Sequence, residues 1–286
     1  MRFGIVILPD QPWSQGGDRW RRAESYGFDH AWTYDHLAWR TLADGPWYDA
    51  VSTLTAAALT TSRIRLGTLV ANPNFRHPVT FSRQLMGLDD ISGGRFTLGV
   101  GAGASALDPT ILGDTPLAPR QLVSRLGEFV ELLDKLLTTD HVSYDGEYFR
   151  AVDARTLPGC AQRPRLPFVV AANGPRSMRV AARFGKGWVT TGPKAEDAEG
   201  WWQGVAELAK RMDDILDEST MDRHLSLDAC PVFSLSSVDY FAEATGRAAE
   251  LGFTDVITHW PRESDWYAGS VDVLEEVVTS VMPRYR

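Results

Sequence analysis

The chain has 286 residues, 44% of them hydrophobic and 23% charged, which is typical of a globular protein with ample material for a core. Its formal net charge of −8 argues against binding to nucleic acid or to anionic membranes, because both require a basic surface. No apolar run approaches the roughly 18 residues that a membrane-spanning helix needs, so we expect a cytoplasmic protein. Its two cysteines, Cys160 and Cys230, form no motif and are expected to stay unpaired.

Short apolar runs alternate with amphipathic stretches along the whole chain. We interpret the first run, at 3–8, as a strand and not as a signal peptide, because no small-residue cleavage site follows it. The predicted strands are 3–8, 30–35, 64–71, 95–103, 167–173, 187–192, 225–233 and 253–260. The predicted helices are 18–27, 49–61, 78–91, 120–138, 176–184, 196–216, 238–251 and 270–282.

Eight strand and helix units of this kind predict a closed (β/α)8 TIM barrel that occupies residues 1–286 as a single domain. Strands joined by crossover helices run parallel and are buried on both faces, which explains their nearly continuous apolar runs. Two loop insertions interrupt the pattern. Residues 104–119 follow strand 4 and are a candidate lid, and residues 139–166, before strand 5, contain a predicted hairpin around Asp145-Gly146.

The carboxyl ends of the barrel strands are where such barrels keep their chemistry. Here these ends offer small residues, amides, hydroxyls and aromatic rings, with no paired acids suited to glycoside hydrolysis. His36 and His259 lie at strand ends, but the histidines and acids do not form a convergent ligand set, so we expect no metal. Lys194 is poorly placed for Schiff-base chemistry. This surface suits a flat, conjugated ligand that brings its own reactivity.

The stretch AANGPRSM, at 171–178, is a candidate phosphate site. Pro175 suits the first helical turn, and the amides of Arg176, Ser177 and Met178 are then expected to lie unpaired at the positive end of the helix dipole. Gly174 permits close approach, and the Ser177 hydroxyl can add a donor, so an anion would fit there. The alternative is a helix capped by the Asn173 side chain, with water at the amides.

His36, in TYDHLAW, is the candidate catalytic residue. Histidine titrates near neutral pH, as a proton donor or acceptor beside a redox ring must do. Asp35 either orients this ring or caps the following loop. In GVGAG, Gly101 and its glycine neighbours allow a planar group to approach strand 4, although glycine also serves barrel packing.

Four segments resemble the luciferase-like monooxygenase superfamily, which includes F420-dependent oxidoreductases: TYDHL, RIRLGTLVANPNFRHP, LDDISGGRFTLGVGAG and AANGPRSMRVAARFGKGWVTTG. The resemblance covers essentially the whole chain. It implies a TIM barrel that binds FMN or coenzyme F420 at its C-terminal face, often as a homodimer. The implied cofactor phosphate site is the turn Gly174-Pro175-Arg176-Ser177.

The resemblance also assigns other positions. Val70-Ala71-Asn72 is similar to the segment in which the family carries a non-prolyl cis peptide under the flavin ring. His36 occupies the place of the family's catalytic histidine, and Thr191 lines the same pocket. This chain departs from the pattern at Ala102, where luciferases use an arginine for the FMN phosphate. It also lacks the glutamate found nearby in many F420 enzymes. On balance the sequence motifs NPxxRHP and SGGR favour F420 over FMN.

The function implied is that of an F420- or FMN-dependent oxidoreductase or monooxygenase. It would reduce, oxidise or oxygenate a small organic substrate, with a flavin reductase as partner if it uses FMN. Trp13, Trp39, Trp47 and the loop 104–119 would contact an apolar or aromatic substrate, unless the tryptophans only pack against the rim. The competing hypothesis is a non-catalytic flavin carrier or sensor on the same barrel.

Overall fold

The computed structural model describes residues 1–216 and 220–286 and confirms the predicted barrel. Eight parallel strands close in the order β1-β10-β9-β8-β7-β4-β3-β2. The strands are β1 (Arg2–Val6), β2 (His30–Thr33), β3 (Arg65–Thr68), β4 (Phe96–Val100), β7 (Phe168–Ala171), β8 (Gly187–Thr190), β9 (Asp222–Ser226) and β10 (Asp255–His259).

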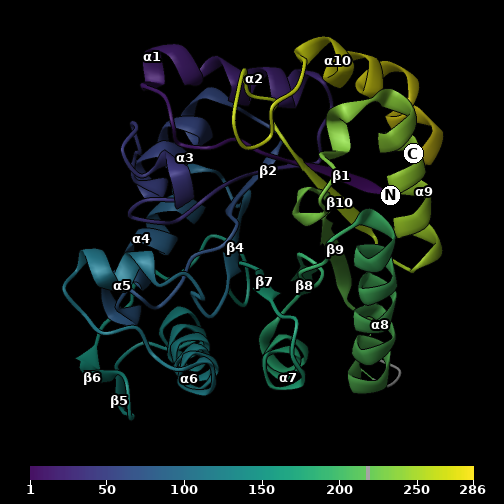
Figure 1. Ribbon diagram of the computed structural model, residues 1–286. Helices are drawn as coiled ribbons and strands as arrows, with labels where there is room; N and C mark the ends of the chain where they lie inside the picture. Colours follow the sequence, from purple (N-terminus) through teal and green to yellow (C-terminus); the bar gives the residue numbers. More distant parts are fainter. Residues whose placement is uncertain (217–219) are drawn as a thin grey trace.

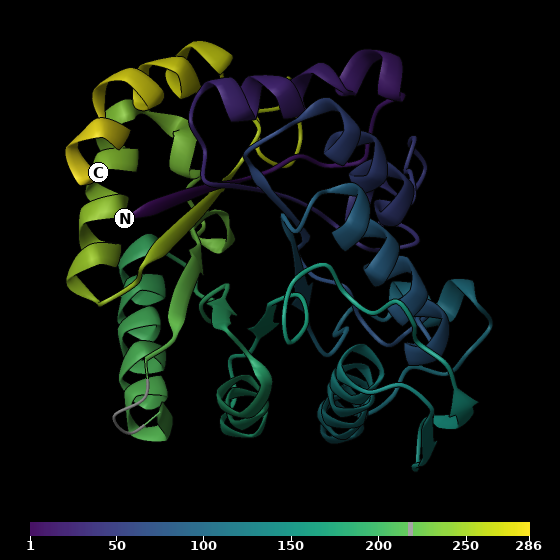
Figure 2. The same ribbon diagram turned by 180° about the vertical axis from the view of Figure 1, so that it is seen from behind.

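The helices surround the strands on the outside, as Figure 1 and Figure 2 show from opposite sides. The α-helices are α1 (Trp13–Gly16), α2 (Asp18–Ser25), α3 (Ala50–Thr60), α4 (Pro78–Ile91), α5 (Leu107–Ile111), α6 (Pro119–Thr138), α7 (Pro175–Phe184), α8 (Ala198–Leu216), α9 (Val238–Glu250) and α10 (Val271–Ser280). Short 3-10 helices are η1 (Arg40–Leu42), η2 (Leu227–Ala229), η3 (Ser234–Ser236) and η4 (Met282–Tyr285). The chain ends meet, since the Met1 amino group donates to Tyr285 O at 3.0 Å.

The core has two parts. A large apolar layer lies between the strands and the surrounding helices, and a smaller cluster fills the barrel around Trp32. Trp32 fits because its neighbour on β3 is a glycine: a Cβ atom on Gly67 would lie 2.4 Å from the indole. Each fully buried side chain of this size stabilises the fold by about 1.5–3 kcal/mol.

Both insertions lie where the sequence predicted them. Residues 139–166 contain the antiparallel hairpin of β5 (Val142–Asp145) and β6 (Arg150–Ala154), at the edge of the molecule in Figure 1. The loop 104–119 contains the short helix α5. Whether this loop closes as a lid stays a prediction.

One strand prediction was wrong in its position. Strand 7 was expected at 225–233, but β9 spans Asp222–Ser226 and is followed by η2. The strand begins with polar residues, and two of them, Asp222 and His224, line a cavity at the amino end of the barrel. The residues that follow the strand are therefore Leu227 and Asp228, and not Val232 and Phe233.

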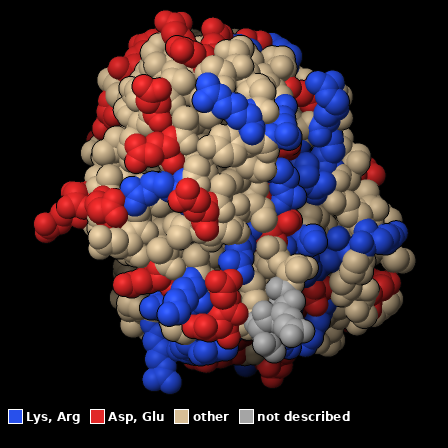
Figure 3. Space-filling model, turned by 90° about the vertical axis from the view of Figure 1, so that its right-hand side faces the viewer, with Lys and Arg blue, Asp and Glu red and all other residues tan. Residues whose placement is uncertain are grey.

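The surface carries both signs of charge. In the face shown in Figure 3, basic side chains gather in a band, with acidic side chains beside them. In the part of the chain that the structure describes, no helix combines the length and the apolar character needed to cross a membrane.

Candidate active site

The carboxyl ends of β3 and β4 form a small apolar surface at the barrel mouth. The peptide bond between Leu69 and Val70 is cis, in the segment where the resemblance implied such a bond. The Gly101 N–H donates to Ala71 O at 2.9 Å. A Cβ atom on Gly101 would lie 2.7 Å from Cγ2 of Val70 and 3.2 Å from Cβ of Ala171, so glycine is the residue that fits between them.

His36 follows β2, and a buried carboxylate holds its ring. Its Nδ1 lies 2.7 Å from Asp108 Oδ2, and the other oxygen of Asp108 accepts the Leu37 N–H at 2.8 Å. Asp108 is completely buried, whereas the His36 side chain is 16% exposed. Because a carboxylate oxygen accepts, the ring hydrogen sits on Nδ1 and leaves Nε2 as an acceptor. No residue in the described ranges bonds to Nε2.

Asp35 does not orient His36. Its two oxygens accept from Arg76, at 2.6 Å from Nη2 and 3.1 Å from Nε, and Arg76 also pairs with Asp49 at 3.1 Å. Burial raises the pKa of Asp35, against the opposing effect of Arg76. The backbone oxygen of Asp35 accepts from Asn72 Nδ2 at 3.1 Å, so this network fixes the loop that carries His36. Buried Asn72 thus ties β2 to β3.

Helix α7 begins at the Asn-Gly-Pro break. Its first intrahelical bond runs from the Met178 N–H to Gly174 O at 2.9 Å, so the prediction that the Met178 amide is unpaired was wrong, and Pro175 has no N–H. The amides of Arg176 and Ser177 therefore have no acceptor inside the helix and lie at the positive end of its dipole. The Ser177 hydroxyl donates to Gly174 O at 3.0 Å, so the expected extra donor is engaged within the turn.

The hypothesis that Asn173 caps this helix is wrong. Its Nδ2 donates to Gly192 O at 2.8 Å, and its Oδ1 accepts from Thr190 Oγ1 at 2.7 Å. The side chain therefore joins the end of β7 to the end of β8. Thr191, which is exposed, lies with its Oγ1 3.5 Å from Asn173 Nδ2.

A chain of polar groups that sequence reasoning missed spans the ends of β2 and β10. The Tyr34 hydroxyl lies 2.8 Å from His259 Nε2 and 2.9 Å from the Tyr267 hydroxyl, and His259 Nδ1 lies 2.8 Å from Asp228 Oδ2. Burial lowers the pKa of His259 and raises that of Tyr34 well above its usual range. Tyr34 and Tyr267 pack against the same apolar cluster as Val70 at the barrel mouth.

The three tryptophans proposed for substrate contact have different environments. Trp39 is buried, with its ring 5.2 Å from Tyr34 and 6.0 Å from Tyr267, which favours a packing role. The Trp47 indole donates to His36 O at 2.8 Å and so lies beside the candidate catalytic residue. Trp13 is exposed on α1.

A family model described as luciferase-like monooxygenase matches residues 1–227. The chain belongs to the luciferase-like monooxygenase family. An F420-dependent glucose-6-phosphate dehydrogenase of Amycolatopsis mediterranei is 34% identical over 178 residues, which are 60% of this chain and 52% of that protein. A 5,10-methylenetetrahydromethanopterin reductase of Archaeoglobus fulgidus is 31% identical over 201 residues, 70% of this chain and 55% of the relative. The chain thus spans about half the length of these relatives.

A solved structure of lower sequence identity shares the fold of this chain. The crystal structure of a monooxygenase from Streptomyces bottropensis superimposes with a TM-score of 0.81 at 21% identity and covers 100% of both chains. The family match ends before β10, so the chain of Tyr34, His259 and Asp228 lies partly outside it.

The luciferase-like barrel brings most of the predicted site residues to adjacent strand ends. Val70, Ala71 and Gly101 lie at the ends of β3 and β4, and Asn173, Gly174, Pro175, Arg176, Ser177 and Thr191 lie at the next two strands. Their role in cofactor binding stays a prediction. Asp108 was missed because it is 72 positions from His36 and no local pattern marks it.

Proposed function

We propose that the chain is an oxidoreductase that uses coenzyme F420, with FMN as the alternative, to convert a small organic substrate. The observation that carries this proposal is the His36–Asp108 pair at the barrel mouth. A protein that only carries a cofactor does not need an imidazole fixed by a buried carboxylate. The F420-dependent relative and the alanine at position 102, in place of an FMN-binding arginine, favour F420.

The residues present fit such a cofactor. The amides of Arg176 and Ser177 at the start of α7 suit its phosphate group. A Cβ atom on Gly174 would meet only Ser177 Oγ, at 3.9 Å, so the backbone there is open to close approach. The small surface of Val70, Gly101 and Ala171 suits a planar ring.

When bound, the cofactor would supply the redox chemistry, and the chain would hold and move a proton. His36 Nε2 would accept a proton from a substrate hydroxyl, or return one to a carbonyl oxygen in the reverse direction. Asp108 would keep the ring in the required tautomer and stabilise it when it is protonated. The apolar mouth around Val70 would exclude water.

Several finer properties belong to the same proposal. We propose an apolar or aromatic substrate, because the Trp47 ring adjoins His36. We also propose that residues 1–286 act as one domain, in the cytoplasm and as a homodimer, with a flavin reductase as partner if FMN is the cofactor.

The proposal is tested with purified protein. Titration with F420, oxidised FMN and reduced FMN gives three dissociation constants, and turnover is then measured with a panel of alcohols, aldehydes and aromatic compounds. His36→Ala should lower kcat far more than it weakens cofactor binding. His141→Ala, on the exposed hairpin, is the matched control and should change neither. Cofactor binding without turnover of any substrate would favour the carrier.

A further inference from the structure

A cavity of about 620 Å³ opens at the other end of the barrel, where the strands begin. The first residues of five strands line it, and Lys186 lies just before β8. These first residues are Arg2, His30, Arg65, Asp222 and Asp255. Such barrels carry their chemistry at the carboxyl ends of the strands, so this cavity is separate from the candidate active site. Its volume is in the range of small-molecule sites.

The acids of this cavity already have partners. Six Arg and Lys residues and four Asp residues line it. Asp222 and Asp255 both pair with Arg2, at 2.8 and 2.6 Å, and Asp134 pairs with Arg165 at 2.6 Å. The fourth, Asp29, accepts the Phe3 N–H at 2.8 Å and lies 3.9 Å from Arg286.

Among the described residues, the other basic side chains of the cavity do not form ion pairs. Within the described ranges no carboxylate lies within ion-pair distance of Arg65, Lys186, Arg163 or Arg183. Arg65 is partly buried, and its guanidinium donates only to uncharged oxygens, including Thr97 Oγ1 at 3.0 Å and Gln162 Oε1 at 3.1 Å. Asp89 and Asp222 attract the Arg65 charge only from beyond ion-pair distance, and a partly buried charge without a paired counter-charge is costly. The cavity therefore has a local excess of positive charge in a protein of net charge −8.

A cation is the competing occupant, because ligand atoms of His30, His224 and Asp255 lie within 4.8 Å of one another. The hydrogen bonds argue against it. Trp32 Nε1 donates to His30 Nδ1 at 2.6 Å, so His30 Nε2 carries a hydrogen and donates to Asp255 Oδ1 at 2.9 Å. Arg2 also donates to both oxygens of Asp255, at 2.8 and 2.6 Å. A metal ion would have to displace both partners.

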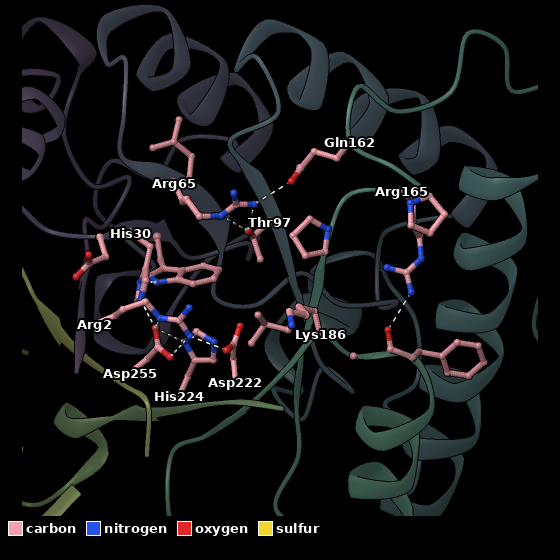
Figure 4. A pocket seen from close by; sticks show the side chains of 18 of the residues that line it. Arg2, His30, Arg65, Thr97, Gln162, Arg165, Lys186, Asp222, His224 and Asp255 are labelled. Carbon is pink, nitrogen blue, oxygen red and sulfur yellow. Dashed lines mark hydrogen bonds and ion pairs between the residues drawn. The ribbon is translucent and has the colours of Figure 1, made fainter. Parts of the chain in front are cut away.

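We propose that this cavity binds a small molecule through an oxyanion, a carboxylate or a phosphate, held by Arg65 and Lys186. Figure 4 shows Arg65 above the cluster of Arg2, His224, Asp222 and Asp255, with Lys186 to the right of that cluster in this view. Apolar groups of Trp32, Leu66 and Val169 line the same cavity and would contact the body of the ligand. Guanidinium and ammonium groups are the usual partners of such oxyanions.

Isothermal titration of the cofactor-free chain with inorganic phosphate, and separately with citrate, at constant ionic strength tests the proposal. Phosphate can also bind at the start of α7, so both titrations are repeated with Ser177→Asp. We expect saturable binding of at least one anion that survives Ser177→Asp and weakens at least about tenfold in Arg65→Met and in Lys186→Met. The anion that binds more tightly shows whether the oxyanion of the ligand is a phosphate or a carboxylate. Arg63→Met, an exposed neighbour, is the matched control and should bind like the parent.

Thermal unfolding checks that each variant is folded, and Lys186→Met, at an exposed position, carries the test if Arg65→Met does not fold. The proposal is overturned if neither anion binds, if Ser177→Asp alone removes all binding, or if both Met variants bind like the parent. Saturable Zn²⁺ binding that His224→Gln removes would also overturn it, in favour of a metal site. None of these outcomes bears on the His36 chemistry, which the cofactor titrations test separately.

Discussion

Replacing Asp108 with Asn tests the inferred role of the buried carboxylate most directly. The new side chain has the same size and can still accept the Leu37 N–H, which now lies 2.8 Å from Oδ1. Its amide nitrogen, however, donates where Oδ2 accepted from His36 Nδ1 at 2.7 Å. The imidazole would then carry its hydrogen on Nε2 and lose the acceptor that the reaction needs, together with the charge that stabilises its protonated form.

The size of the effect follows from the bond that is lost. A hydrogen bond to a charged group contributes about 1.5–3 kcal/mol, which is a factor of about 10 to 150. Loss of positioned acid-base catalysis costs about 10² to 10⁴ in rate. The two ranges overlap near about 100-fold, so we expect kcat to fall by about that factor. The dissociation constant of the cofactor should change less than about threefold, because α7 and Gly101 are untouched.

Steady-state turnover and a cofactor titration measure the two quantities separately. Asp114→Asn is the matched control, since Asp114 is an exposed acid of the same loop. A variant with Asn at position 108 that is folded and turns over at the parent's rate would refute the tautomer argument. So would a variant that loses cofactor affinity and kcat together, because Asp108 would then support the loop and not the ring.

Ser177→Asp should weaken cofactor binding at least about tenfold, because a carboxylate repels a phosphate; thermal unfolding checks that the variant is folded, since Ser177 is buried and its hydroxyl donates to Gly174 O. Unchanged affinity in a folded variant would remove the phosphate assignment. Gly101→Ala should destabilise the fold by about 1–3 kcal/mol through its contact with Val70, and Val70→Ala should restore part of that loss in the double variant measured by chemical denaturation. Burial lowers the pKa of His224 to about 4, so the unfolded chain binds more protons between pH 6.5 and that value. Stability should therefore be complete above pH about 6.5 and fall by about 1–3 kcal/mol on acidification to pH about 4, and His224→Gln should flatten that slope.

The barrel could be predicted because buried parallel strands leave a signal that is local in sequence. Each predicted helix overlaps an observed one, and the hairpin at Asp145-Gly146 is confirmed. The error at β9 has a physical cause. The strand begins with Asp222, Arg223 and His224, of which Asp222 and His224 line a cavity, and these polar residues break the apolar run on which the prediction depended.

The site could be predicted only where one segment forms it. The start of α7 is such a case, since Gly174, Pro175 and Ser177 are consecutive or nearly so. The partners of His36 and Tyr34 could not be predicted, because they are far from them in sequence. Asp108 and His259 come from a loop and a strand that only the closed barrel brings near them. An acid inside a Gly/Pro-rich loop has no periodicity or spacing that marks it. Asp35, the acid next to His36 in sequence, was the natural candidate and pairs with Arg76 instead.

The position of Asp108 links the loop 104–119 to the chemistry of His36. The carboxylate lies on α5, inside this loop, and is completely buried against the segment that follows β2. A movement of the loop that carried α5 away would separate Oδ2 from Nδ1 and free the ring to change tautomer. The loop therefore does more than border the mouth: while it holds its present position, it sets the protonation pattern of the candidate base. If the loop closes as a lid, His36 would be able to accept a proton only in the closed state. Closure would then exclude water from the site and activate the base in the same step.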